Sequence, residues 1–173
     1  VKLGRVHLSV GDTIKARDAF VEALTRWSET PTAYAGLGDV LYTRRDYRGA
    51  IGNYENALWW HAQAGEESDL DEVSVRLSLA DAYAELHLPQ AAVEQYERVL
   101  ELRPGEVGAW QGRFRIHARR CELEPALQAL EALIGIEGET NTAVYVGELM
   151  DACPDAELPP WADRFLEDPA DSP

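Results

Sequence analysis

The sequence predicts an all-α protein built from about four helical hairpins that share one pattern of residues. Five landmark residues recur at fixed intervals along the chain, which indicates a repeat architecture. The landmarks are small or apolar residues at helical spacing, and 46% of the 173 residues are hydrophobic, enough to bury a core. No chemically reactive residue takes part in the repeated pattern. The repeat is therefore interpreted as a packing device.

The second repeat shows how one hairpin is built. Leu37 and Gly38 lie in its first helix, while Ala50, Tyr54 and Ala57 lie on one face of its second helix at i, i+4 and i+7. Small residues let two helices approach closely, and we expect the aromatic ring to fill the gap between neighbouring repeats. One hairpin cannot bury its apolar face alone, so we expect the hairpins to stack.

The same landmarks occur in three further copies, with tight turns marked by Gly11, Asp12 and Asp46. The fourth copy departs from the pattern, because Arg113 and Phe114 stand where Leu and a small residue are expected. The equivalent residues are Leu3, Gly4, Ala16, Phe20 and Ala23 at 34 residues upstream, Leu79, Ala80, Ala92, Tyr96 and Val99 at 42 residues downstream, and Trp110, Ala126, Leu130 and Leu133 after a further 34.

The third copy, Arg76 to Pro104, resembles the tetratricopeptide repeat (TPR), with its W-x2-L-G-x2-Y, A-x3-F and closing Pro pattern. The 42-residue step is similar to the spacing of kinesin light chain repeats and predicts an extended second helix and a longer loop. The resemblance implies a right-handed superhelical solenoid with a concave groove. The expected segments are a repeat array at 1–152, divided into 1–30, 31–72 with the insertion, 73–106, 107–140 and a capping helix at 141–152, and an acidic tail with a short helix at 153–173.

The charge of the chain argues against several partners. A net charge of −15 and a pI near 4.6 disfavour nucleic acid, because phosphate binding needs clustered lysines and arginines. The basic run Arg113–Arg120 keeps RNA as an alternative, although arginines spread around one helix and paired with glutamates are the simpler interpretation. No apolar stretch approaches the roughly 18 residues of a membrane helix. We predict no nucleic-acid partner and no membrane insertion.

The composition also carries expectations about source and location. Lys2 and Lys15 are the chain's two lysines, which favours codon bias in a bacterial source. The chain opens on Val1, so we expect it to be the C-terminal part of a longer protein. Cys121 and Cys153 show no CxxC spacing, and we expect them about 10 Å apart, too far for a relaxed bridge. Two free thiols and a cytoplasmic location are therefore predicted.

The sequence offers no motif for catalysis. No HExxH or GxSxG pattern occurs, and the acidic residues are interpreted as solvated helix faces. We predict a protein that is not an enzyme and that holds no cofactor or metal. The histidines are scattered one per repeat or junction, at His7, His61, His87 and His117.

The family resemblance places the candidate binding surface on the first helix of each repeat. The positions two and six after the landmark leucine point away from the second helix, toward the groove of TPR proteins. This face is acidic in the middle repeats and basic in the fourth, so a peptide with complementary charges is favoured. Ordinary solvated charges are the alternative. The candidate partner-binding residues are Arg5, Asp39, Tyr42, Asp81, Glu85, Arg115 and Arg119.

Together these patterns predict a non-catalytic scaffold that binds a protein or peptide partner in the concave groove of a TPR solenoid. Two alternatives stay open. The repeats can be an accessory or regulatory module of a larger enzyme or signalling protein, or they can mediate self-association.

Overall fold

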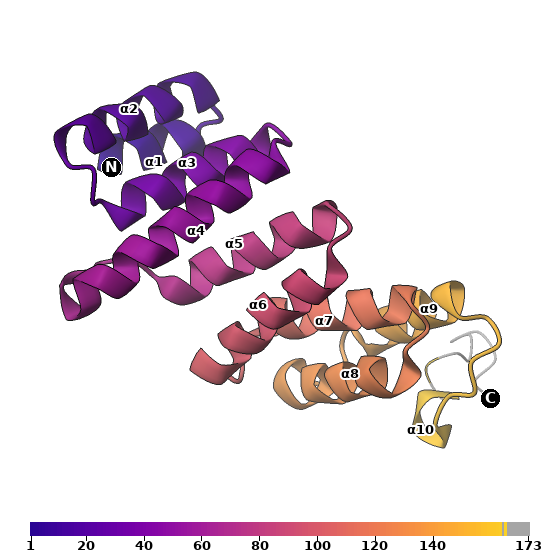
Figure 1. The fold of residues 1–173 in the computed structure, drawn as a ribbon. Helices are drawn as coiled ribbons and strands as arrows, with labels where there is room; N and C mark the ends of the chain where they lie inside the picture. The colour runs from indigo at the N-terminus through magenta and orange to yellow at the C-terminus, as the bar shows by residue number, and fades with distance from the viewer. Residues whose placement is uncertain (164, 166–173) are drawn as a thin grey trace. The chain divides into compact units, whose positions relative to one another are not determined.

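The computed structural model describes residues 1–163 and 165, which form ten α-helices and one short 3-10 helix, with no β-strand among them (Figure 1). The predicted all-α class is confirmed. Residues 164 and 166–173 of the predicted tail lie outside the described residues. The helices pair into hairpins: α1 (Lys2–Ser9) with α2 (Thr13–Arg26), α3 (Pro31–Thr43) with α4 (Tyr47–Ala64), α5 (Glu72–Glu85) with α6 (Pro89–Leu102), and α7 (Val107–Arg119) with α8 (Leu123–Glu137).

The chain divides into two compact units. Unit 1 is Val1–Leu102 and contains the first three hairpins. Unit 2 is Arg103–Pro173 and contains the fourth hairpin, followed by α9 (Thr142–Ala152) and α10 (Pro160–Asp163). Each hairpin has a first helix, called helix A here, and a second helix, called helix B.

The small landmarks of unit 1 lie against aromatic rings, as the pattern predicts. A Cβ atom on Gly38 would collide with the ring of Tyr54 in the same hairpin, and one on Gly4 would collide with Phe20. Phe20 also lies against Gly36 of the next hairpin, so this ring fills a gap between neighbouring repeats. A larger residue at Gly4, Gly36 or Gly38 would therefore force the ring to move.

The landmark leucines differ in burial along the chain. Leu37 is partly buried and packs against the buried cluster that contains Phe20 of α2, on helix B of the preceding hairpin. Leu79 is 2% exposed, whereas Leu3 is 61% exposed. The expectation that Leu3 packs into the core is wrong, because within the described residues no earlier helix covers that face of α1.

The turn between helices A and B has one geometry in all four hairpins. One residue in each turn has a positive φ, a region that favours glycine. Asp12 and Asp46 then cap helix B, accepting hydrogen bonds from the backbone N–H of Lys15 at 3.1 Å and of Gly49 at 3.0 Å. The predicted turns are confirmed. The positive-φ residues are Gly11 (79°), Arg45 (60°), His87 (56°) and Cys121 (51°).

The insertion after the second repeat lengthens helix B, as predicted. Helix α4 runs for 18 residues and ends at Ala64, directly before η1 (Gly65–Glu67). His61 Nδ1 lies 2.7 Å from the hydroxyl of Ser68, and His61 Nε2 lies 3.6 Å from a carboxylate oxygen of Glu72. These contacts fasten the inserted loop to α4 and to the start of α5.

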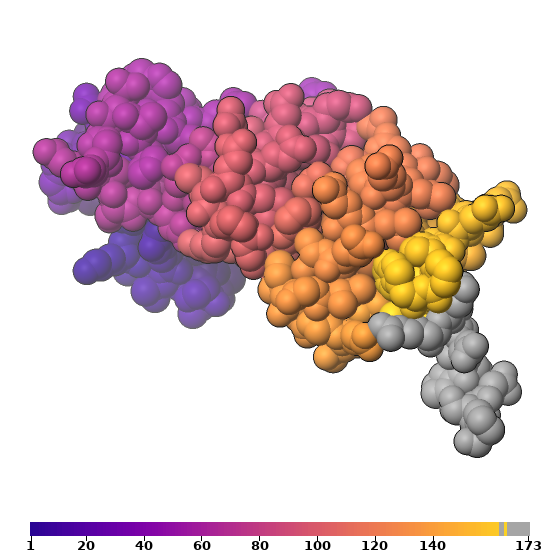
Figure 2. Space-filling model, turned by 90° about the horizontal axis from the view of Figure 1, so that it is seen from below, coloured from indigo at the N-terminus to yellow at the C-terminus, as the bar shows by residue number. Residues whose placement is uncertain are grey.

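Unit 2 reverses the sizes of the packing residues. Phe114 on α7 and Leu130 on α8 are both fully buried, so the large ring now belongs to helix A. The Phe114 ring packs edge-on against Tyr145 of α9, with centroids 5.4 Å apart. Partly buried Leu158 and Trp161 extend this core, and Figure 2 shows the yellow C-terminal segment against the orange surface of unit 2.

The two cysteines form a disulfide, so the prediction of free thiols is wrong. Cys121 lies in the turn after α7 and Cys153 is the C-cap of α9, and their Cα atoms are 5.6 Å apart. The expected distance assumed that both residues end equivalent helices. Because Cys121 lies beyond Arg119, in a left-handed turn, it reaches toward α9. The cytoplasmic location stays a prediction without support from free thiols.

Candidate functional site

Five of the predicted site residues lie on the A helices of unit 1, and the structure brings them close enough to interact. Arg5 on α1 acts electrostatically on Asp39 of α3, and Asp81 and Glu85 of α5 act on Tyr42 of α3. We call this set the helix-A face. It joins charged or aromatic residues from three successive hairpins, one from the first and two from each of the next two: Arg5, Asp39, Tyr42, Asp81 and Glu85.

Two carboxylates of the helix-A face are held by helix B, which the sequence interpretation missed. The hydroxyl of Tyr54 donates a hydrogen bond to Asp39 at 3.0 Å, and that of Tyr96 donates to Asp81 at 2.6 Å. The expectation that these aspartates face away from helix B is therefore wrong. A recurring signal was present, because in both repeats the tyrosine follows the aspartate by 15 residues.

The two aspartates differ in exposure. Asp39 is half-buried, and burial raises the pKa of its carboxyl group, although the Tyr54 hydrogen bond and the charge of Arg5 oppose that shift. Asp81 is exposed. Asp39 is therefore mainly a structural group, whereas Asp81 can reach a partner.

A cluster of two phenols and two carboxylates forms the most distinctive part of the helix-A face. The rings of Tyr42 and Tyr47 meet edge to face with centroids 5.3 Å apart. The pKa of Tyr42 is raised by burial and then by the charges of Asp81 and Glu85, and the pKa of Tyr47 is raised by burial and then by Glu85. We call Tyr42, Tyr47, Asp81 and Glu85 the acidic–aromatic cluster. Tyr47 was not predicted, because it begins helix B rather than lying on helix A.

Arg115 and Arg119 belong to unit 2 and have acidic neighbours there. Arg115 Nε lies 3.5 Å from a carboxylate oxygen of Glu148 on α9. A pocket of about 350 Å³ is lined by both arginines together with Ala118, Glu148, Asp151 and Ala152. The carboxylates of α9 therefore oppose the basic character expected of this region. A single site of seven residues stays a prediction, because its members divide between the two units.

The basic run Arg113–Arg120 makes contacts typical of a structural helix. Arg113 lies over the ring of Trp110, 5.1 Å from its centroid, and Arg120 Nε lies 2.8 Å from a carboxylate oxygen of Glu122. Such contacts support the simpler interpretation of the run.

Glu122 also holds a histidine at the turn after α7. His117 Nδ1 lies 2.7 Å from its carboxylate, and this contact, above all, lowers the pKa of Glu122. Across the described residues no group of three histidine, cysteine, aspartate or glutamate side chains is arranged to hold a metal. In the same part of the chain, no helix has the length and apolar character needed to cross a membrane.

Two sequence profiles of the tetratricopeptide repeat family match the chain, over residues 29–104 and 77–141. The chain therefore belongs to the TPR family, whose members are generally non-catalytic scaffolds for protein interactions. No curated protein matches it at a significant level.

Solved structures share this fold at low sequence identity. MamA aligns with a TM-score of 0.71 at 17% identity, covering 80% of this chain and 76% of that one. YrrB, described as a TPR protein with an unusual peptide-binding site, aligns at 0.67 and 20% identity over 88% and 84% of the two chains. The putative kinesin light chain TPR-like repeats of Podosopora anserina align with a TM-score of 0.70 at 16% identity, covering 95% of this chain and 89% of that one. These likenesses confirm the all-α TPR fold.

Proposed function

We propose that this chain is a non-catalytic scaffold whose helix-A face in unit 1 binds a protein or peptide partner through a basic side chain. The observation that carries the proposal is the acidic–aromatic cluster. Two phenol rings and two carboxylates from three successive helices converge there, and the one cation that acts on the pKa of Tyr47 is Arg45 at the neighbouring turn.

The chemistry of the cluster favours an Arg or Lys side chain. Aromatic ring faces attract a cation within about 6 Å of the ring centroid, and carboxylates accept hydrogen bonds from its N–H groups. Burial is the main cause of the raised pKa values of Tyr42 and Tyr47, but the charges of Asp81 and Glu85 add to the shift of Tyr42 and that of Glu85 to the shift of Tyr47, and the same negative charges would stabilise a cation. Net charge of −15 on the whole chain would also speed the approach of a basic partner.

Unit 2 supplies a second contact in this proposal. Arg115 and Arg119 would bind a carboxylate of the partner, displacing the neighbouring Glu148 from Arg115. The peptide-binding site named for YrrB supports a peptide as the ligand class. An accessory role in a larger enzyme or signalling protein, and self-association, remain the alternatives to an independent scaffold.

The proposal can be tested with the full chain and an array of 12-residue peptides, each with Arg or Lys at its centre. Peptides that bind are then titrated against two charge-matched variants, Glu85→Lys in the cluster and Glu66→Lys in η1, which is also exposed. We expect Glu85→Lys to weaken binding at least about tenfold, and Glu66→Lys to change it less than about twofold.

The two variants also separate a specific site from a diffuse field. Equal weakening by both would mean that net charge alone attracts the peptides. A preference for acidic peptides, unaffected by Glu85→Lys, would overturn the proposed surface. Asp81→Asn adds a milder arm, because it removes the charge and keeps an oxygen that can accept from Tyr96.

A further inference from the structure

We propose that the Cys121–Cys153 disulfide is a reducible staple that holds α9 on α7, and that a small thiol opens it by attacking Cys121. Two observations carry this inference. The bond joins two separate elements of unit 2, and its two cysteine residues differ in their exposure to solvent. The staple does not depend on the partner-binding role proposed above.

The disulfide is placed where it controls the spacing of two helices. Its cysteines are 32 positions apart in sequence, and the polypeptide between them includes all of α8 and α9. Cys121 Sγ lies 3.3 Å from the carbonyl oxygen of Ala152, and Cys153 Sγ lies 3.3 Å from that of Ala118. Each sulfur therefore touches the backbone of the opposite helix, and the bond fixes the ends of α7 and α9 against each other.

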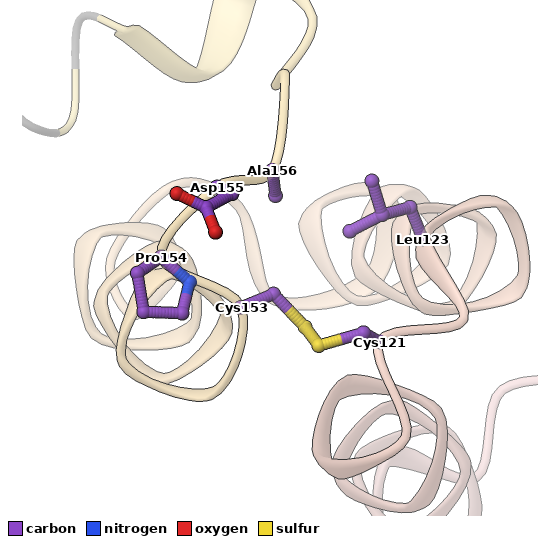
Figure 3. Close-up of a pocket in the computed structure, with 6 residues that line it drawn as sticks. All are labelled: Cys121, Leu123, Cys153, Pro154, Asp155 and Ala156. Atoms are coloured by element: carbon purple, nitrogen blue, oxygen red, sulfur yellow. A yellow bond between two sulfur atoms is a disulfide. The ribbon is translucent and has the colours of Figure 1, made fainter.

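An open pocket gives access to the bond. It has a volume of about 260 Å³, and Figure 3 shows the disulfide in it, with Leu123 on one side and Asp155 and Ala156 on the other. Cys121 is exposed, whereas Cys153 is 5% exposed. Since thiol–disulfide exchange requires access to the attacked sulfur, we infer attack at Cys121 with Cys153 as the leaving group.

The exchange proceeds in two balanced steps. A thiolate attacks Cys121 Sγ, which forms a mixed disulfide with Cys121 and releases Cys153 as a thiolate that takes up a proton. A second thiolate attacks the sulfur of the bound reagent, which releases the oxidised reagent and leaves Cys121 as a thiolate. Two electrons pass from the two thiols to the protein disulfide. The reductant is a low-molecular-weight thiol, and the carboxylate of Asp155 at the pocket should disfavour an anionic one.

Opening the staple should loosen the C-terminal part of unit 2. Without the bond, α9 is held on α7 by packing, by the Arg115–Glu148 pair at the pocket that contains Arg119, and by the hydrogen bond that Gln111 Nε2 donates to the Tyr145 hydroxyl at 2.7 Å. Residues after Cys153 pack on the same core through Leu158 and Trp161. We therefore expect local opening of residues 142–163 while α7 and α8 stay paired.

The test compares hydrogen exchange of the full chain before and after treatment with 2-mercaptoethanol. Reduction should speed amide exchange in residues 142–163 by about tenfold or more and leave unit 1 unchanged. The double variant Cys121→Ser/Cys153→Ser is the control, since the thiol should change nothing in it. Exchange that is unaltered by complete reduction of the wild-type bond would overturn the staple.

The site of attack is tested separately with single variants. Cys153→Ser leaves Cys121 free and exposed, and Cys121→Ser leaves Cys153 buried, so iodoacetamide should alkylate the first variant at least about tenfold faster. Equal reactivity would overturn attack at Cys121. 2-Mercaptoethanol should also reduce the wild type faster than the anionic 2-mercaptoethanesulfonate, and Asp155→Asn should narrow that difference. A native chain whose mass shows two thiols without any reductant would overturn the proposal altogether.

Discussion

The second and fourth hairpins exchange the chemistry of three equivalent positions. In the second hairpin, Gly38 lies against Tyr54, and the Tyr54 hydroxyl reaches Asp39. The fourth hairpin has Phe114, Leu130 and Arg115 at the corresponding positions. In the second hairpin the ring lies on helix B, with a glycine and a hydrogen-bond acceptor on helix A, whereas in the fourth hairpin the ring and a cation both lie on helix A.

Core packing and surface charge are therefore coupled in this protein. A buried tyrosine needs an acceptor for its hydroxyl, and the acceptor is the residue directly after the glycine of helix A. Where helix B carries Leu130 there is no hydroxyl to satisfy, and Arg115 can occupy the slot. The first hairpin agrees, because Phe20 has no hydroxyl and Arg5 takes the position equivalent to Asp39.

The largest expected effect comes from removing the ring of the fourth hairpin. Phe114→Ala should lower the free energy of unfolding by about 3 to 5 kcal/mol, because it leaves a cavity beside Leu130 and Tyr145. Urea unfolding followed by circular dichroism measures it. Val144→Ala on α9 is the control, since that side chain is 60% exposed and its loss should cost less than about 0.5 kcal/mol. A loss below about 1 kcal/mol for Phe114→Ala would contradict the interpretation that the ring on helix A fills the core of the fourth hairpin.

The reverse change in the second hairpin should cost less. Gly38→Leu drives a side chain into the Tyr54 ring and should destabilise the protein by about 1 to 3 kcal/mol, and Ala80→Leu in the third hairpin should act similarly. Gly52→Leu on α4 is a matched control, because nothing lies within 4 Å of a Cβ at that position. An unchanged melting temperature for Gly38→Leu would show that the two helices tolerate a wider separation.

The hydroxyl of Tyr54 tests the polar half of the comparison. Tyr54→Phe should cost about 1 to 2 kcal/mol, because it leaves the half-buried Asp39 without this donor. Tyr83→Phe removes an exposed hydrogen bond of 2.7 Å to Glu55 and should cost under about 0.5 kcal/mol. Combining Tyr54→Phe with Asp39→Ala should give less than the sum of the single losses. Strict additivity would mean that the pair is not coupled.

The pH dependence of stability also tests the environment of Asp39. The pKa of Asp39 is raised by burial, so the folded protein takes up this proton at a pH where the unfolded chain is still ionised. As the pH falls through the raised pKa, the wild type should gain stability relative to Asp39→Asn. The difference should level off below the ordinary value of 3.8. Thermal unfolding of both proteins between neutral pH and pH 3 measures this difference in stability. A difference of opposite sign would mean that Tyr54 and Arg5 lower the pKa of Asp39 by more than burial raises it.

The turns give the smallest effect. His87 and Arg45 occupy the left-handed position that Gly11 holds in the first hairpin. His87→Gly should stabilise the protein by about 0.5 to 1 kcal/mol, and Gly11→Ala should destabilise it by about 1 kcal/mol. Chemical denaturation of both variants provides the measurement. Opposite signs for the two changes are the expected result, and equal signs would contradict a shared turn geometry.

Much of the fold could be predicted because the landmark residues pack against neighbours that are close in sequence. Gly38 and Tyr54 lie in the two helices of one hairpin, so their positions along these helices are enough to predict the contact. Leu3 could not be placed from its own helix, since its burial depends on whether another helix lies before α1. The hydrogen bond from Tyr54 to Asp39 was missed because a helical wheel treats one helix at a time. The Tyr54 ring packs on Gly38, but its hydroxyl reaches past the glycine to the side chain of the next residue.

The candidate site and the disulfide were harder to predict for a related reason. Tyr47 completes the acidic–aromatic cluster from helix B, which a search restricted to helix A leaves out. Cys121 and Cys153 meet because a left-handed turn redirects the chain beyond the end of α7, and the sequence gives no sign of φ at a cysteine. Such contacts arise between elements, where spacing along the chain no longer sets the distance.

The disulfide also has a mechanical consequence. Arrays of helical repeats peel apart from their ends when they are stretched, because each repeat is held by its neighbours. A force applied beyond Cys153 would pass through the bond directly to Cys121, so the 31 residues between the two cysteines, which are 32 positions apart, would carry no load. Unit 2 would therefore release a contour length that is shorter by about 110 Å while the bond is intact, at roughly 3.4 Å per residue. Reduction of the bond would make this segment extensible.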